Sequence, residues 1–361
     1  MVRISDIASD LGVSRSLVSK VLSGRMGKSS VRPDLAAKIH ARAKQLGYVP
    51  SASAKALFSG RQNVIGVFIS RHGQPGSGLI EALIDGIAAE LVRTQQRMML
   101  QFFHDESDFD LCMKLAHPSN LDGIVVAGAP YFNLLPKLQT ILGRDIPVAT
   151  MLDVPLSPDL PNVGIDQTEV GRLATLHLIE QGCRRPVFLR VSTMTVPSLR
   201  FNGYRMALNE SGIPYRSELV CKMSSYEPKV VPRLIDALLA SGMPFDGVVT
   251  ESDLQSASVL RALLSAGKQI PTDIKLIGVD DSPICQYGVI PLSSVSGQDR
   301  KRAGLAVKLL KEVIDGMPVR NLLIPPVVMA RESSTTLAGH PLSGTLSKPE
   351  KRTTRRSAKS P

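Results

Sequence analysis

Residues 4–22 read ISDIASDLGVSRSLVSKVL, and this stretch carries the strongest local signal in the chain. Gly12 divides it into two short segments, each with apolar residues at helical spacing, and Ser14 is suited to cap the second segment. The apolar positions are Ile4, Ile7, Ala8 and Leu11 in the first segment and Leu17, Val18, Val21 and Leu22 in the second. A helix, a sharp turn and a second helix are typical of a helix-turn-helix.

A third helix is predicted after Pro33, a residue that fits the first helical position. Leu35, Ile39, Ala43 and Leu46 share one face of it, and Gly47 ends it. The sequence therefore predicts a three-helix unit over residues 1–49.

The predicted second helix buries its apolar face and leaves short polar and basic side chains outside. These are Arg15, Ser16, Ser19 and Lys20. Such side chains can reach base edges in the major groove, and Lys and Arg can hold phosphates. The alternative is a small helical bundle with a solvated basic face.

The positive charge lies at the two ends of the 361-residue chain. Residues 1–61 carry 11 Lys and Arg against 3 Asp and Glu, residues 62–340 carry 26 against 28, and residues 341–361 carry 6 against 1. A strongly basic unit of this size is the electrostatic footprint of a surface that meets DNA phosphates. The length itself favours two or three domains.

Residues 50–61 (PSASAKALFSGR) are small and polar, as in a linker, and after them strand and helix patterns alternate. The expected strands are 64–69, 98–103, 123–126 and 187–191, and the expected helices are 80–91 and 201–211. This alternation predicts parallel βαβ units.

An internal echo supports two similar halves within residues 62–340. Residues 121–126 read LDGIVV and residues 245–250 read FDGVVT. Two α/β lobes around a cleft would hold a small ligand. Residues 341–361 are rich in Ser, Thr, Pro and basic residues, which predicts a disordered basic tail.

The sequence offers little for catalysis, cofactors or metals. Gly27-Lys28-Ser29 ends like a phosphate-binding loop, but Leu22 stands where the first glycine should be. The six histidines have no ligand spacing, and the four cysteines, Cys112, Cys183, Cys221 and Cys285, stand far apart, which predicts buried thiols. The first residues have no apolar segment, and no run of 18 apolar residues occurs, so a cytoplasmic protein without a membrane span is expected.

Taken in order, several motifs resemble the LacI/GalR family of bacterial transcription regulators over roughly residues 4–337. They are Ile7-Ala8, Leu11-Gly12-Val13-Ser14, Val18-Ser19-Lys20-Val21-Leu22, Leu46-Gly47-Tyr48-Val49-Pro50, Ala54-Lys55-Ala56-Leu57, Gly66-Val67, Arg200 with Gly203-Tyr204, Gly278-Val279-Asp280-Asp281, Pro291-Leu292-Ser293-Ser294-Val295 and Ala330-Arg331-Glu332-Ser333-Ser334. The resemblance implies a homodimer that binds double-stranded DNA at a pseudopalindromic operator.

The resemblance also implies roles for residues in the DNA-binding part. Arg15 and Ser16 resemble the recognition-helix positions that touch bases, and Lys20 matches a position usually filled by Arg. The resemblance implies that residues 50–61 form a hinge helix, in which Leu57 resembles the leucine that wedges into the minor groove, with Ala54 beside it. The alternative for Leu57 is an ordinary linker leucine.

For the small-molecule effector, the resemblance implies that Arg200 and Asp280 contact the ligand. Guanidinium donors and carboxylate acceptors suit the hydroxyls of a sugar or sugar derivative. Tyr226, Asp153 and Ser252 match pocket positions more loosely. The alternatives are that Asp280 caps a loop and that Tyr226 is a core residue.

This sequence departs from the family pattern at several points. Arg3 and Arg32 stand where the first and third helices usually have a capping Thr or Ser, and the turn at residues 24–31 is longer than usual. The basic tail is not a family feature and is either a source of nonspecific DNA affinity or simply solvated.

The expected function is that of a sequence-specific regulator, a repressor, whose operator affinity depends on an effector bound between two lobes. Two alternatives stay open: a sugar receptor without a role in gene regulation, and an enzyme on the same α/β scaffold. The sequence leaves open which molecule is the effector, with a purine as an alternative to a sugar, and whether it weakens or strengthens DNA binding.

Overall fold

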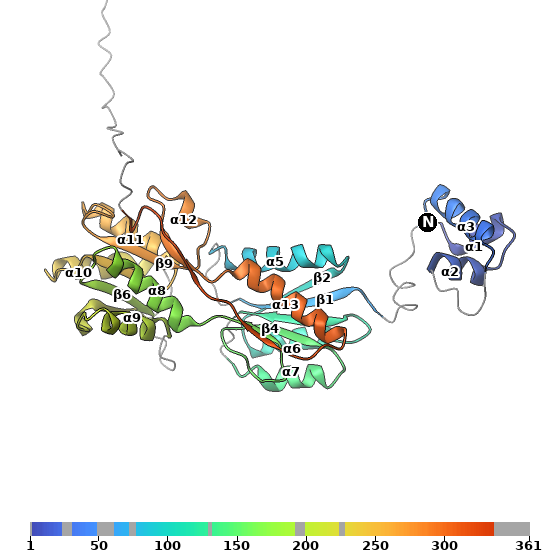
Figure 1. Ribbon diagram of the computed structural model, residues 1–361, viewed down its shortest axis with the longest axis horizontal. Coiled ribbons are helices and arrows are strands. Elements are labelled where there is room, and N and C mark those ends of the chain that lie inside the picture. Colours follow the sequence, from blue (N-terminus) through green and yellow to red (C-terminus); the bar gives the residue numbers. More distant parts are fainter. Residues whose placement is uncertain are drawn as a thin grey trace, which may run out of the picture.

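The computed structural model describes residues 2–23, 31–48, 61–71, 77–128, 132–191, 199–223 and 228–335. Its N-terminal part is a unit of three helices, and the rest forms two α/β lobes (Figure 1). The helices of the N-terminal unit are α1 (Ile4–Asp10), α2 (Arg15–Ser23) and α3 (Pro33–Gln45). The expected fold class, a helix-turn-helix unit followed by a two-lobed α/β domain, is confirmed.

The three-helix unit is held by the apolar positions that the sequence pattern predicted. Ile7, Val18 and Ile39, one from each helix, are fully buried at its centre. Gly12 and Gly47 follow α1 and α3 with φ of +63° and +66°, a backbone conformation that costs glycine little. The unit therefore folds around contacts that are spaced as a helical pattern requires.

The N-terminal lobe is a six-stranded parallel sheet in the order β11-β5-β4-β3-β1-β2. Its strands are β1 (Val64–Ser70), β2 (Arg97–Phe103), β3 (Gly123–Ala127), β4 (Val148–Met151), β5 (Asn162–Gly164) and β11 (Asn321–Leu323). Helices α5 (Leu79–Arg93) and α13 (Asp299–Ile314) cover one face, and α6 (Glu106–Leu115) and α7 (Leu135–Leu142) cover the other.

The C-terminal lobe repeats this plan in the order β12-β10-β9-β8-β6-β7, with β12 antiparallel to its neighbour. Its strands are β6 (Pro186–Val191), β7 (Val220–Met223), β8 (Gly247–Thr250), β9 (Lys275–Val279), β10 (Ser293–Ser296) and β12 (Val327–Met329). Helices α8 (Gln167–Glu180) and α9 (Leu199–Glu210) cover one face, and α10 (Val231–Ala240) and α11 (Asp253–Ser265) the other, while the short α12 (Ile284–Tyr287), η1 (Ser217–Leu219) and η2 (Pro228–Val230) lie in connections.

The sequence motif repeated at residues 121–126 and 245–250 makes the same kind of hydrogen bonds in both lobes. Asp122 precedes β3, and its carboxylate accepts bonds from the backbone N–H groups of residues 62 and 63, at 2.5 and 2.7 Å. Asp246 precedes β8 and accepts from the N–H groups of residues 184 and 185, at 2.7 and 2.8 Å. In each lobe one aspartate thus ties the third strand to the chain that enters the first.

Glycines allow two pairs of helices to cross at very short range. A Cβ atom on Gly171 in α8 would lie 1.9 Å from the carbonyl oxygen of Arg200 in α9, and one on Gly203 would lie 2.0 Å from the carbonyl oxygen of Thr168. In the other lobe, a Cβ on Gly86 in α5 would lie 2.1 Å from the carbonyl oxygen of Arg300 in α13. The backbones of α8 and α9 therefore touch beside the junction of the lobes.

Three segments carry the chain between the lobes, from β5 to α8, from β10 to α13 and from β11 to β12 (Figure 1). Hydrogen bonds join them to one another. The N–H of Ile324 donates to the carbonyl of Gly164 at 3.0 Å, and Nε2 of Gln298 donates to the carbonyl of Pro325 at 2.7 Å. We call these three connecting segments the hinge between the two lobes.

Candidate DNA-reading surface and effector site

The predicted DNA-reading side chains lie on the outer face of α2. Arg15, Ser16 and Lys20 are exposed and Ser19 is half-buried. Ser14 begins the helix, because its Oγ accepts from the N–H of residue 17 at 3.2 Å. The first turn of α2 therefore presents short polar and basic groups, as the first turn of a recognition helix does.

The start of α1 has a replacement for its missing cap. No side-chain cap bond is formed by Arg3 or Arg32. At α1, however, the carboxylate of Asp6 accepts from the N–H of Arg3 at 2.9 Å, which satisfies that end from inside the helix. Arg42 of α3 also binds Asp10 of α1, with Nε 2.9 Å from Oδ2.

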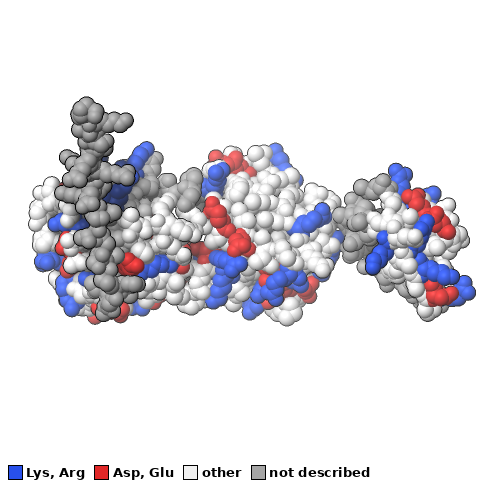
Figure 2. Space-filling view, turned by 90° about the horizontal axis from the view of Figure 1, so that it is seen from above, with Lys and Arg blue, Asp and Glu red and all other residues white. Residues whose placement is uncertain are grey.

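Figure 2 shows lysine and arginine side chains at several places on the surface of this unit.

The linker part of the prediction lies outside the described residues. Ala54 and Leu57 fall in the interval 49–60, and their minor-groove role stays a prediction. The expected long turn after α2 falls mostly in the interval 24–30, and the glycine-lysine-serine motif falls there too.

Arg200 stands in the first turn of α9, where the C-terminal lobe faces the hinge. Its Nε donates to Oε1 of Gln167 at 2.7 Å, and its Nη1 donates to the carbonyl oxygen of Glu251 at the end of β8. Its Nη2 lies 3.8 Å from Oδ1 of Asp280, which follows β9. The structure thus brings together Arg200 and Asp280, the two residues singled out for effector contact.

Asp153 joins this group from the N-terminal lobe. It follows β4, and its Oδ1 accepts from Nε2 of Gln167 at 3.0 Å. A continuous series of polar contacts therefore runs from Asp153 through Gln167 and Arg200 to Asp280, from the end of a strand in one lobe to the end of a strand in the other. The carboxyl ends of parallel strands are the usual place for ligands in α/β folds.

Asp280 has both a perturbed carboxyl pKa and an unusual backbone conformation. Burial raises the pKa of its carboxyl well above the usual value, with Arg200 opposing this shift and the carboxylates of Asp253, Asp299 and Asp153 adding to it. Its φ is +111°, a conformation that non-glycine residues rarely adopt. Strain and a perturbed pKa in one residue are more frequent at binding sites than elsewhere.

Several residues of this region were missed by sequence reasoning. Asp299, at the start of α13, has a carboxyl whose pKa is raised by burial, while Arg302 and Arg200 oppose the shift. Arg302 is buried and donates to Asp299 at 2.9 Å and to the carbonyl of Val163 at 3.3 Å. Gln167, Asp299 and Arg302 all lie in the first turn of a helix that directly follows a hinge segment. That position is the signal by which they could have been found.

Ser252 and Tyr226 are the other two residues that match pocket positions more loosely. Ser252 is the N-cap of α11, and its Oγ accepts from the N–H of Gln255 at 3.4 Å. Ser252 therefore caps a helix in this structure, and its contact with an effector stays a prediction. Tyr226 lies in the interval 224–227, outside the described residues.

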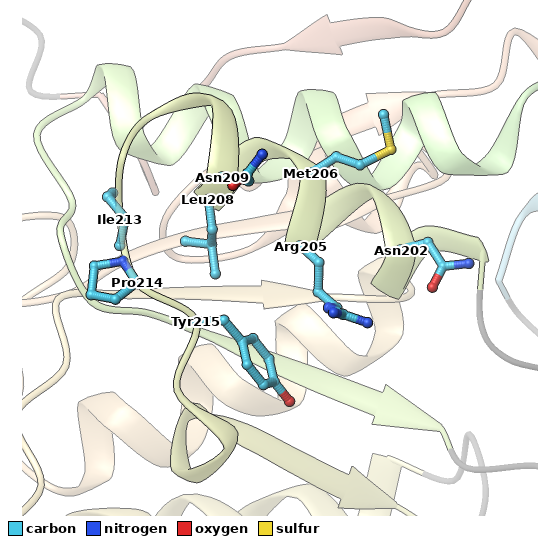
Figure 3. Close-up of a pocket in the computed structure, with 8 residues that line it drawn as sticks. All are labelled: Asn202, Arg205, Met206, Leu208, Asn209, Ile213, Pro214 and Tyr215. Atoms are coloured by element: carbon cyan, nitrogen blue, oxygen red, sulfur yellow. The ribbon is translucent and has the colours of Figure 1, made fainter.

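A surface hollow of about 510 Å³ lies elsewhere, on the outer side of the C-terminal lobe. It is formed by α9 and the segment after it, and Arg205 and Tyr215 point toward one another in it (Figure 3). The guanidinium carbon of Arg205 is 5.4 Å from the centre of the Tyr215 ring. Neither Arg200 nor Asp280 lines this hollow, so it is separate from the predicted effector residues.

The described residues also bear on three further expectations, which concern metal binding, membrane spans and the cysteines. Within the described ranges no group of His, Cys, Asp and Glu is arranged to hold a metal ion, and no helix has the length and apolar character needed to cross a membrane. Cys112, Cys183 and Cys285 are buried and Cys221 is half-buried, all as free thiols. Burial raises the pKa of Cys112 to about 11 and of Cys183 to about 12, which keeps them protonated.

Comparison with known proteins agrees with this arrangement over almost the whole chain. Residues 175–334 match the periplasmic binding protein-like domain family. The chain is 27% identical over 337 residues to the HTH-type transcriptional regulator CelR of Thermobifida fusca, covering 91% of this chain and 96% of that protein. It is 28% identical over 327 residues to the ribose operon repressor of Bacillus subtilis, covering 90% and 95%. The chain is thus similar, over about nine tenths of its length, to transcription regulators of the LacI/GalR family.

Solved structures of similar proteins have the same fold as this chain. The lac repressor dimer bound to operator and an anti-inducer superposes with a TM-score of 0.75 at 19% identity, covering 93% of this chain and 99% of that one. A CelR–cellobiose complex superposes with a TM-score of 0.65 at 24% identity, covering 92% and 100%. The resemblance inferred from the sequence motifs is therefore confirmed.

Proposed function

We propose that this chain is a LacI/GalR regulator, a homodimeric repressor that binds a pseudopalindromic operator and is controlled by a sugar or sugar derivative at the junction of its lobes. It acts in the cytoplasm, where it has access to the chromosome. Arg15, Ser16, Ser19 and Lys20 read DNA, and Ala54 and Leu57 extend the contact into the minor groove.

The observation that carries the proposal is the contact series from Asp153 to Asp280 at the hinge. Its guanidinium, amide and carboxylate groups are the donors and acceptors that bind neighbouring hydroxyls. They lie where a ligand can favour one lobe arrangement over another, which is what an effector must do to change affinity for DNA. The ribose operon repressor and the CelR–cellobiose complex support a sugar as the ligand class.

The proposal favours a regulator over the two other classes considered. A transport or chemotaxis receptor has no need of a basic three-helix unit with an exposed recognition-helix face. An enzyme on this scaffold would need a nucleophile, base or metal set beside the ligand, and the described part of the site contains carboxylates, an amide and arginines that bind one another. The relatives found are regulators.

Selection of bound sequences from a random duplex library tests the proposal. The full-length protein is used at several salt concentrations, because nonspecific phosphate binding weakens steeply with salt. We expect a pseudopalindrome, and we expect Arg15→Ala to change the preferred bases at its half-site positions by about 1–3 kcal/mol per base pair. Recovery of no motif at any salt, or an unchanged ranking of sites in Arg15→Ala, would contradict the proposal.

A further inference from the structure

Gln167 connects a predicted effector residue in each lobe. As the first residue of α8, it donates from Nε2 to Asp153 at 3.0 Å and accepts at Oε1 from Nε of Arg200 at 2.7 Å. A neutral amide is suited to this place because it offers a donor to a carboxylate and an acceptor to a guanidinium at once. A carboxylate could bind Arg200 but would repel Asp153, and an aliphatic side chain would bind neither.

The two contacts of Gln167 differ in how freely they can change. Gln167 and Arg200 belong to helices whose backbones touch at Gly171 and Gly203, so they are fixed relative to one another. The first turn of α8 is fixed as well, because Asp166 accepts from two N–H groups of that turn, at 2.8 and 3.1 Å. The contact with Asp153 instead spans the hinge segment between β5 and α8.

We propose that Gln167 is a positioning residue that couples effector binding at Arg200 to the arrangement of the two lobes. This inference rests on the proposed function, since it assigns a regulatory role within the same site. A ligand hydroxyl that accepts from Nε of Arg200 competes with Oε1 of Gln167. The amide then loses the bond that orients it, and its contact with Asp153 weakens. Occupation of the site is thereby transmitted to the hinge.

Amide hydrogen exchange in the full-length protein, without DNA or sugar, tests this directly. The reporter is the N–H of Ile165, in the hinge segment, which donates to the carbonyl of Asp153 at 3.3 Å. Rates are expressed as protection relative to an unstructured peptide at the same pH. We expect Gln167→Leu to lower protection of Ile165 by about tenfold, the effect of losing one hydrogen bond to a charged group. Gln139→Leu, at an exposed position on α7, is the matched control and should leave it unchanged.

Gln167→Glu separates an electrostatic role from a simple loss of packing. At about pH 8 the introduced carboxylate faces Asp153, and protection should fall at least as far as in Gln167→Leu. Because this glutamate keeps the size of glutamine and can still accept from Arg200, a fall in protection would come from repulsion of Asp153 rather than from lost packing.

A double-mutant cycle tests the step from Arg200 to the hinge. Arg200→Ala should also lower protection of Ile165, and the double variant Arg200→Ala/Gln167→Leu should be no worse than Gln167→Leu alone, because both act through one amide. Additive effects, unchanged protection in Gln167→Leu, or wild-type protection in Gln167→Glu would overturn the inference. Since no operator or sugar enters the measurement, its failure is distinguishable from failure of the proposed function.

Discussion

The two lobes are built on the same scaffold but differ in what they contribute at the junction. Each has a first strand between the second and third, and an aspartate before the third strand that binds the chain entering the first. The C-terminal lobe contributes Arg200, Gln167 and Asp280, both donors and acceptors. The N-terminal lobe contributes the carboxylates of Asp153 and Asp299. The two lobes therefore share their architecture, and they differ in the polar groups that they offer to a ligand.

The largest expected effect concerns the glycine crossings that position the site. Gly171→Ala places a Cβ 1.9 Å from a backbone carbonyl oxygen that cannot move away easily. We expect the free energy of unfolding to fall by more than about 3 kcal/mol, measured by denaturant unfolding. Gly86→Ala in the other lobe should have a similar effect, since its nearest backbone oxygen is at 2.1 Å.

Gly143→Ala is the matched control for both substitutions. A Cβ at Gly143 would meet its nearest atoms at 3.5 and 3.6 Å, an ordinary contact distance. It should therefore be tolerated within about 0.5 kcal/mol. If Gly171→Ala were tolerated equally well, the close contact of α8 and α9 would not be what holds Arg200 in place.

An intermediate effect is expected at the two aspartates that the lobes have in common. Asp122→Ala and Asp246→Ala each remove an acceptor from two backbone N–H groups. We expect each to lower the free energy of unfolding by about 1–3 kcal/mol, by similar amounts, with one lobe melting before the other in each variant. Calorimetry would reveal the two transitions, and a large effect at only one aspartate would show that the lobes are not equivalent.

The smallest effect is a gain in stability at Asp280. Its folded-state pKa is raised by burial, so the folded protein binds a proton that the unfolded chain has already lost. The stability contribution of this carboxyl therefore falls as pH rises from about 4, its unfolded value, through the raised value. Asp280→Asn removes this penalty, and we expect Tm at neutral pH to rise by about 2–4 °C and its pH dependence to flatten.

Asp281→Asn is the control for the neighbouring position. Asp281 accepts from Arg331 at 2.6 Å, and its substitution should lower Tm rather than raise it. A lower Tm in Asp280→Asn at neutral pH would contradict the assignment of a raised pKa to Asp280.

Much of the fold was predictable because it depends on local periodicity. Every apolar position predicted for the three helices of the N-terminal unit lies in its core. The expected strands at 64–69 and 187–191 correspond to β1 and β6, with ends shifted by one residue. Short buried strands such as β4 and β5 were missed, because three or four residues are too few to show a distinctive period.

The site was predictable only in part, for a different physical reason. Arg200, Asp280 and Asp153 followed from motif resemblance, and the structure places them together. Gln167 did not, since a glutamine after an aspartate at a helix start has no signature of its own. Its role depends on the packing of α8 against α9 and on the position of the hinge, and both are tertiary properties.

The most direct test of the account is whether ligand control resides at the lobe junction. Operator release by sugars, including ribose and cellobiose, is measured by fluorescence anisotropy for the wild type, Arg200→Ala and Arg205→Ala. Arg205 lies on the same helix but lines the outer hollow of the C-terminal lobe. We expect operator affinity to be retained in both variants and the concentration of effector required to rise at least about thirtyfold in Arg200→Ala alone. A wild-type response in Arg200→Ala with a lost response in Arg205→Ala would contradict the account and move the effector site to the outer hollow.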